Sequence, residues 1–125
     1  MVGTKTRPSL LYMVKQLELA VRSHLDELVK PAGITALQYT ALTVLERHDG
    51  LSAAQLARDS FVTAQSMADL VRSLESRGLI RRERNPRNRR ELLILLTDAG
   101  RELLAGVAGS VRELEERFRQ ALSKA

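Results

Sequence analysis

The chain has 125 residues and no cysteine, and its 20 Lys and Arg residues against 15 Asp and Glu residues give a net charge of 20 − 15 = +5. Without cysteine it cannot form disulfides, thiolate metal sites or thiol redox sensors. Its longest purely aliphatic run, Leu92 to Leu96, is far shorter than the roughly 20 residues that span a bilayer. With no basic-then-apolar signal pattern at the N-terminus, we expect one soluble, cytoplasmic domain over residues 1–125 and no membrane partner.

A long amphipathic helix is predicted for residues 8–30. Its apolar residues recur at intervals of three and four, and the sequence Pro31-Ala32-Gly33 ends the pattern. Two shorter helices follow, the first ending near Asp49-Gly50 and the second near Arg58. Each begins after a hydroxyl residue that can cap it, Thr35 and Ser52 respectively. Leu, Val and Ala supply most of the apolar residues, which favours packed helices.

The next helix begins after Thr63 and ends at Gly78. Met67, Leu70, Val71 and Leu74 fall at i, i+3, i+4 and i+7, so one stripe is buried. The opposite face carries groups that can read base edges, since Gln bonds adenine, Arg bonds guanine and Ala touches a thymine methyl. An ordinary solvated helix face is the alternative. The candidate DNA contacts on and near this helix are Ser52, Thr63, Ala64, Gln65, Ser66, Ala68, Asp69 and Arg72.

An arginine-rich segment follows. Six of the eleven residues from Ile80 to Arg90 are arginine and one is acidic, so this segment carries 6 − 1 = +5, the net charge of the whole chain. Apolar residues flank it and Asn85-Pro86 marks a turn, which predicts strands over 79–84 and 91–96 with a cationic tip. Nucleic acid is the leading partner for such a localised charge. The candidate contacts here are Arg84, Arg87, Arg89 and Arg90.

Thr97 is predicted to cap a last long helix, over residues 98–123. Its apolar stripe and that of the first helix have two interpretations: they cover the core of one chain, or they join two copies. Two helices of more than about 20 residues supply more apolar surface than a lobe of about 65 residues can cover, which favours a homodimer. The candidate dimer contacts are Leu10, Val14, Leu17, Val107, Val111, Leu114 and Phe118.

A helix, a turn, a second helix and a basic hairpin make the arrangement of a winged helix-turn-helix. The segments GITALQY (33–39), LSAAQLA (51–57), LESRGLIRR (74–82) and RRELLILLTDAG (89–100) resemble, in this order and spacing, the MarR (multiple antibiotic resistance regulator) family of winged-helix repressors. The resemblance implies a mainly α fold with a small β hairpin. Residues 33–97 would form the DNA-binding lobe, and 8–30 and 98–123 the dimerisation helices.

The resemblance also implies roles for particular residues. Arg90, seven residues before Thr97, matches the wing arginine that enters the minor groove in the family. Asn85 and Asn88 stand where relatives usually carry acidic residues, which makes this wing more cationic. The chain also ends soon after the last long helix, where relatives commonly add another dimerisation helix, so we expect a smaller dimer interface.

Relatives often release DNA when a small aromatic or phenolic effector enters the crevice between the dimer helices and the lobe. Tyr12, His24 and Tyr39 are the candidate lining residues; the alternative is that they are packing or solvated residues. With only His24 and His48 and no Cys, nothing resembles a catalytic or metal-binding set, so we expect no enzyme and no cofactor.

The predicted function is therefore a sequence-specific regulator of transcription that binds double-stranded DNA. It would act as a dimeric repressor on a pseudo-palindromic operator and be released by a small aromatic ligand. A ligand-independent architectural DNA binder is the alternative. A winged helix that binds only protein is disfavoured by Arg89 and Arg90 at the tip.

Overall fold

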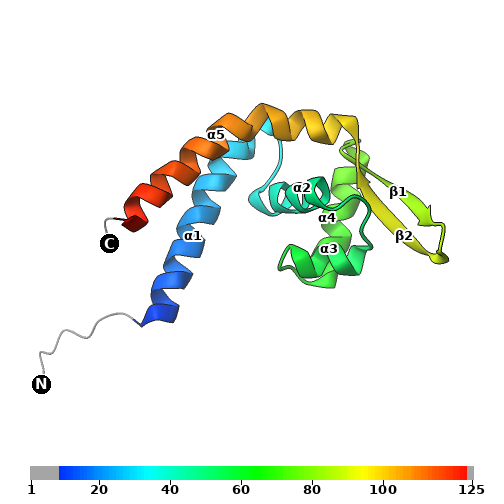
Figure 1. Cartoon of the computed structure of the whole chain (residues 1–125), viewed down its shortest axis with the longest axis horizontal. Coiled ribbons are helices and arrows are strands. Elements are labelled where there is room, and N and C mark those ends of the chain that lie inside the picture. Colours follow the sequence, from blue (N-terminus) through cyan, green and yellow to red (C-terminus); the bar gives the residue numbers. More distant parts are fainter. Residues whose placement is uncertain (1–8, 124–125) are drawn as a thin grey trace, which may run out of the picture.

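The computed structural model describes residues 9–123 (Figure 1). In chain order its elements are α1 (Leu10–Val29), the 3-10 turn η1 (Lys30–Ala32), α2 (Ala36–Arg47), α3 (Ala53–Asp59), α4 (Ala64–Ser76), β1 (Ile80–Asn85), β2 (Asn88–Leu96) and α5 (Asp98–Ser123). The helices α2, α3 and α4 and the β1–β2 hairpin form a lobe, and the hairpin projects from the side opposite α1. The predicted class, mainly α with a small hairpin, is confirmed.

The helix starts follow from local side-chain caps. The hydroxyl of Thr35 accepts from the Gln38 backbone N–H at 3.1 Å, and the Gln38 side chain accepts from the Thr35 N–H at 2.9 Å. Ser52 caps α3 with the same reciprocal pair of bonds, and the Thr63 hydroxyl caps α4 by accepting from the Ser66 backbone N–H. At the start of α5, the Thr97 hydroxyl accepts from the Gly100 N–H at 3.1 Å. These predicted caps are confirmed; Pro8, the predicted start of the first helix, lies outside the described residues.

The hairpin is longer than the sequence predicts. β2 begins at Asn88 instead of Glu91, because the antiparallel ladder continues to an Asn85–Asn88 pair at the tip, with an irregularity in register after Arg84. At the other end of the hairpin Leu51 adds a short bridge: its N–H donates to the Ile94 carbonyl at 3.1 Å and its carbonyl accepts from the Ile94 N–H at 2.7 Å. The hairpin is thereby joined to the segment before α3.

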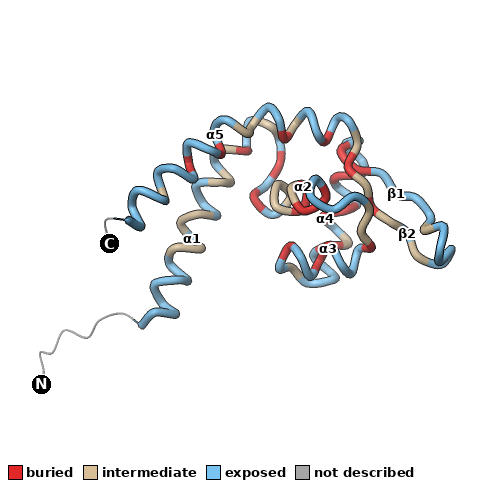
Figure 2. Tube along the Cα trace, viewed as in Figure 1, coloured by how far each residue is buried: buried red, intermediate tan, exposed pale blue. Residues whose placement is uncertain are grey.

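The core lies inside the lobe. All four residues of the predicted α4 stripe are buried, and they meet buried side chains of the other lobe elements, among them Leu42, Leu45, Leu56, Ile80 and Ile94. α1 and α5 pack side by side as an arm that extends from the lobe (Figure 1). Figure 2 shows burial concentrated in the lobe and where the arm joins it, whereas the first turns of α1 are exposed. No described helix is both long and apolar enough to cross a membrane.

At Gly100 the first turn of α5 lies close to the residue before β1 and to the last residue of β2. A Cβ atom there would lie 2.4 Å from the Leu79 carbonyl oxygen and 2.6 Å from Cδ1 of Leu96. We expect Gly100→Ala to lower the free energy of unfolding by about 1–3 kcal/mol, because a close-packed contact must move. Gly106→Ala is the matched control, since a Cβ there meets nothing within 4 Å. It should raise stability by about 0.5–1 kcal/mol through helix propensity. Urea denaturation measures both, and equal effects would contradict this close approach.

Candidate nucleic-acid interface

The outward face of α4 carries the predicted base-reading residues. Gln65 and Arg72 are both exposed and lie seven residues, or two turns, apart. Arg72 forms an ion pair with Asp69 one turn earlier. Asp69 therefore holds the guanidinium close to the helix surface. Of the other α4 candidates, Thr63, Ala64 and Ser66 are exposed and Ala68 is half-buried.

Ser52, a candidate DNA contact, lies where the sequence predicts it, as the residue that caps α3. Its side chain is 9% exposed, and its hydroxyl accepts from the Gln55 N–H at 3.2 Å and donates to the Gln55 side-chain oxygen at 3.1 Å. The hydroxyl is thus engaged in the cap of α3. We assign Ser52 to the support of α3 and leave it out of the DNA interface proposed below.

Asparagine side chains shape the tip of the wing, as we call the hairpin of β1 and β2. Asn85 Oδ1 accepts from the Arg87 backbone N–H at 2.9 Å, and Asn88 Oδ1 accepts from the Arg90 backbone N–H at 3.2 Å. Asn85 also donates to the Glu91 carboxylate at 2.9 Å. Asn88 therefore orders the backbone on which Arg90 sits.

The six arginines of the wing are not equivalent. Arg81 pairs with Glu83 on the same strand, and Arg82 Nη2 lies 3.2 Å from Glu75 Oε1 on α4. Arg84 donates to the Arg89 carbonyl at 2.8 Å. Within residues 9–123 no carboxylate pairs with Arg87, Arg89 or Arg90, and all three are exposed. The uncompensated charge is therefore concentrated at the tip.

Side-chain contacts fix α4 relative to its neighbours. The Arg82–Glu75 ion pair joins α4 to the first strand of the wing. The Gln38 side-chain amide donates to the Ser73 hydroxyl at 3.1 Å, which joins α2 to α4. At the end of α4, the Arg77 guanidinium donates to the Ala32 carbonyl at 3.0 Å and also to the Gly33 carbonyl. The helix and the wing are thus held as one surface, and Arg77 connects this surface to the segment that follows α1.

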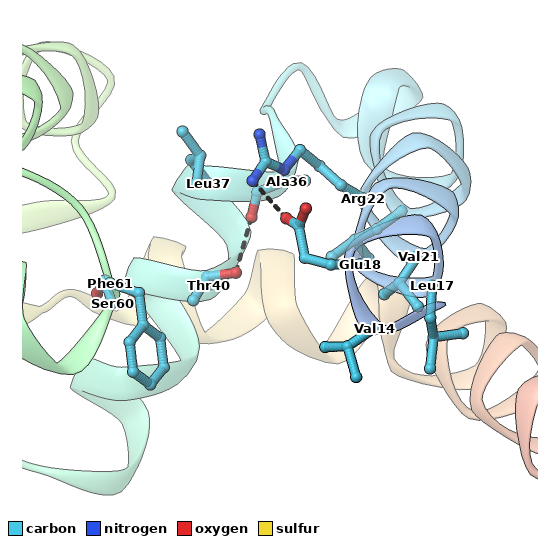
Figure 3. Close-up of a pocket in the computed structure, with 11 residues that line it drawn as sticks. Val14, Leu17, Glu18, Val21, Arg22, Ala36, Leu37, Thr40, Ser60 and Phe61 are labelled. Carbon is cyan, nitrogen blue, oxygen red and sulfur yellow. Dashed lines mark hydrogen bonds and ion pairs between the residues drawn. The ribbon is translucent and has the colours of Figure 1, made fainter. Parts of the chain in front are cut away.

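A cavity of about 480 Å³ lies between α1 and the lobe (Figure 3). One wall is a face of α1 and the other is formed by α2 and the turn between α3 and α4. The crevice implied by the family resemblance therefore has a counterpart here. Its walls are mostly apolar. The lining includes Val14, Glu18 and Arg22 from α1, Leu37 from α2, and Ser60 and Phe61 from the turn.

None of the three predicted effector-binding residues lines this cavity. The Tyr12 hydroxyl is exposed and accepts from the Gln16 side chain at 3.0 Å. His24 Nδ1 lies 2.7 Å from the Ala20 carbonyl oxygen, and its ring meets Phe118 edge-on at 5.7 Å. Tyr39 lines a separate apolar groove of about 390 Å³ that α1 and α5 border. Burial raises the pKa of the Tyr39 hydroxyl, and Glu115 and Glu46 add to the increase.

The structure separates the predicted dimer residues into two groups. Leu10 is 74% exposed, Val14 is also exposed, and Leu17 is half-buried. On α5, Val107 and Phe118 are half-buried, whereas Val111 and Leu114 are buried within the single chain. The expectation of a free stripe along α5 therefore needs correction for Val111 and Leu114, because the packing of the arm already covers them. The exposed members of the predicted set, Leu10 and Val14, lie at the start of α1, where Leu11 and Met13 are also exposed.

A helix-turn-helix formed by α3 and α4, followed by a two-stranded basic wing, defines a winged-helix DNA-binding protein. Comparison with known proteins gives the family. A model described as the MarR family matches residues 32–91. The HTH-type transcriptional repressor Rv2887 of Mycobacterium tuberculosis (strain ATCC 25618 / H37Rv) is 31% identical over 106 residues, which cover 85% of this chain and 76% of that protein. The chain belongs to the MarR family of winged-helix transcriptional regulators.

Two solved structures illustrate the likeness. The transcriptional repressor CouR bound to a 23-mer DNA duplex superposes with a TM-score of 0.76 and 26% identity, covering 93% of this chain and 91% of CouR. NadR in complex with 4-hydroxyphenylacetate superposes with a TM-score of 0.82 at 21% identity, covering 98% of this chain and 86% of NadR. At that identity the second likeness concerns the fold alone.

Proposed function

We propose that this regulator is a dimeric, sequence-specific repressor that binds a pseudo-palindromic operator and is released by a small aromatic effector. The observation that carries the proposal is the wing tip: three exposed arginines without acidic partners, Arg87, Arg89 and Arg90, on a wing that Glu75 joins to α4. In this arrangement, positive charges that can bind the DNA phosphate backbone lie beside a helix whose outward face is polar.

In the proposed complex, the Thr63 end of α4 enters the major groove, so Gln65 and Arg72 face base edges. The wing reaches the adjacent minor groove, where Arg90 inserts and Arg89 and Arg87 contact phosphates. The side-chain ties from α4 to α2 and to β1 support this docking. These contacts fix the distance between α4 and the wing before DNA is bound. Both elements can therefore contact one duplex without the entropy cost of being ordered on binding.

A second copy is proposed to cover the start of α1. Leu10, Leu11, Met13 and Val14 are all exposed there, and such contiguous apolar surface marks an interaction site. A two-fold pairing through this region would present two α4 helices to successive major-groove segments. CouR, which is 26% identical, has been solved on a 23-mer duplex, long enough for two such segments.

The effector is proposed to enter the cavity between α1 and the lobe. This cavity touches the arm on one side and the turn before α4 on the other, so an occupant bears on both parts at once. If the ligand binds more tightly to an arrangement of the arm and α4 that cannot bind DNA, it shifts the population of molecules toward that arrangement. Loss of DNA affinity on addition of an aromatic ligand, measured by fluorescence anisotropy, tests this part. An architectural binder would show no such loss with any ligand.

Two variants on α4 test the readout of sequence. Gln65→Ala should cost about 1–3 kcal/mol on the preferred duplex and relax base preference at one position. Arg72→Ala should do the same at another position, and it also frees Asp69. Ser76→Ala is the control, because Ser76 lies at the opposite end of α4 and bonds only the Ser73 carbonyl. Affinities for a set of single-base variants of the duplex measure the effect. If a substitution lowers the affinity for every duplex equally, the replaced residue contacts phosphate and reads no base.

A further inference from the structure

Two stretches of chain connect the arm to the lobe (Figure 1). One is the segment of residues 30–35 between α1 and α2. The other is α5 itself, which packs on the lobe near its start and against α1 further along. The direction in which the arm leaves the lobe depends on how firmly each connection is held. Side-chain hydrogen bonds hold the first connection, whereas glycines weaken the second.

A carboxylate of α1 caps the start of α2. Asp26 Oδ1 accepts from the Ala36 N–H at 2.6 Å, across ten positions of the sequence. Ala36 is the first residue of α2, so its N–H has no acceptor within the helix. The Thr35 hydroxyl takes a different N–H, that of Gln38. Asp26 therefore adds a second cap that comes from the arm, and this bond holds the end of α1 beside the start of α2.

An arginine at the end of α4 binds the same segment from another side. Arg77, the residue that follows α4, donates to the Ala32 carbonyl at 3.0 Å and also to the Gly33 carbonyl, where η1 ends. The donors of a guanidinium lie in one plane, so two bonds to neighbouring carbonyls fix direction as well as distance. Gly33 permits this approach, since its φ is 80° and a Cβ there would lie 3.0 Å from Arg77 Nη2.

The second connection is less stiff. Leu104 belongs to the core of the lobe, whereas Val111 borders the groove between α1 and α5. Between them lie Gly106 and Gly109, at which a Cβ would meet nothing within 4 Å. Glycine weakens the interior of a helix, and neither position needs it for packing within one chain. This part of α5 therefore restrains the arm less than a run of strong helix formers would, so the direction of the arm depends on the first connection.

We propose that Asp26 and Arg77 form a joint that sets the angle between α1 and α4 and, in the dimer, the spacing of the half-sites that the protein binds. The second part rests on the proposed function, because only a dimer that pairs through α1 converts this angle into a distance between two α4 helices. Arg77 is a positioning residue. It lies at the opposite end of α4 from Thr63, which leads into the major groove in the proposed complex, and its guanidinium bonds to the joint.

The length of α1 makes this angle important. A helix of 20 residues is about 30 Å long. A change of about 10° at one end moves the other end by roughly 5 Å, which exceeds the rise of about 3.4 Å between successive base pairs. A loose joint would therefore let the two α4 helices fit half-sites that are closer together or further apart. The best spacing would then lose the advantage of a preformed distance.

A series of duplexes that differ only in spacing tests the joint. The duplex enriched from a random pool is remade with its half-sites closer together or further apart, and a single half-site is included. We expect Arg77→Met, which keeps the stem and removes both donors, to lower affinity for the best spacing about tenfold and for other spacings less than about threefold. Affinity for the single half-site should stay unchanged, because Arg77 is exposed and outside the core. Arg77→Lys, which can bond one carbonyl, should lie between.

A pair of variants at Asp26 separates the charge from the hydrogen bond. Asp26→Asn keeps an acceptor for the Ala36 N–H and should keep the spacing profile, whereas Asp26→Leu should flatten it. Arg112→Met is the control for the charge removed with Arg77. Arg112 is exposed on α5 and takes no part in these bonds, so this variant should leave the profile unchanged. An unchanged profile in Arg77→Met and Asp26→Leu, or an equal loss at every spacing and at the half-site, would overturn the proposal.

The angle itself is measured separately, without DNA. Because the chain has no cysteine, spin labels can be placed through Gln16→Cys on α1 and Ala54→Cys on α3, both exposed positions. Labelled chains mixed with excess unlabelled protein give the distance between the arm and the lobe of one chain by pulsed electron resonance. Arg77→Met should widen the distribution of this distance, and an equal width refutes the joint. A wider distribution with an unchanged spacing profile refutes the control of spacing, whereas a protein that binds no specific duplex refutes the proposed function and leaves the joint standing.

Discussion

Replacing Arg89 and Arg90 together with alanine should weaken binding to the preferred duplex by roughly a hundredfold, about 1.4 kcal/mol for each arginine. Both guanidinium groups are exposed at the wing tip without an acidic partner in the described chain. They are thus free to contact phosphates or enter a minor groove. Each arginine that neutralises DNA charge, whether at a phosphate or in the minor groove, accounts for about 0.9 of the slope of log K against log salt, so the slope should become shallower by about 2. Anisotropy titrations at several salt concentrations give both quantities.

A variant of equal charge controls for this loss. Arg112→Ala with Arg117→Ala removes two exposed arginines from α5 and gives the same net charge, 18 − 15 = +3. It should change affinity by less than about threefold, because charges more than a Debye length from the DNA are screened. If the α5 pair weakened binding as much as the wing pair, general charge and not the wing tip would account for the affinity.

Replacing Leu10 and Leu11 together with aspartate should convert the protein into a folded monomer. Both side chains are exposed in the single chain, at 74% and 81%, so the fold of one chain does not depend on them. In the proposed dimer they are buried, and burying a carboxylate costs several kcal/mol for each ion. Light scattering after size exclusion measures the mass. Affinity for a palindromic duplex should fall steeply, while weak binding to a single half-site persists.

Gln16→Asp with Ser23→Asp is the matched control, since both residues are exposed polar positions on the same helix. This control should remain a dimer. A leucine variant that stays a tight dimer would contradict the proposed contact at the start of α1. Leu114→Asp is less informative about assembly, because Leu114 is 5% exposed within one chain. An aspartate there should unfold the α1–α5 packing whether or not a dimer forms.

Much of the fold is predictable from local signals. The caps at Thr35 and Thr63 are short side-chain motifs that need only the neighbouring backbone. The stripe on α4 is a periodic pattern that any amphipathic helix must show. The positive charge of the wing follows directly from the six arginines in residues 80–90. What the sequence does not reveal is which arginines remain free, because the pairing of Arg82 with Glu75 brings together two separate elements.

The dimer residues and the effector-binding residues are mispredicted for one reason: both depend on how the helices are placed relative to other elements. Periodicity shows that Val111 and Leu114 face something apolar, but it does not say whether that surface belongs to the same chain or to a partner. Tyr12 and His24 have side chains of the kind that line effector sites, yet whether a helix residue faces a cavity depends on how the helix is rotated in the fold. One signal was available: Glu18 and Arg22 interrupt the apolar pattern of α1 one turn apart, which is where the cavity lies.

Selection of bound duplexes from a random DNA pool tests the central claim most directly, because it examines binding, symmetry and spacing in one experiment. The dimeric regulator proposed here should enrich two inverted half-sites whose centres lie about 10 base pairs, or one helical turn, apart. The Leu10→Asp and Leu11→Asp double variant, put through the same selection, should enrich at most one half-site. A pool without an enriched motif, or a single unpaired motif for the unaltered protein, would contradict sequence-specific binding by a symmetric dimer.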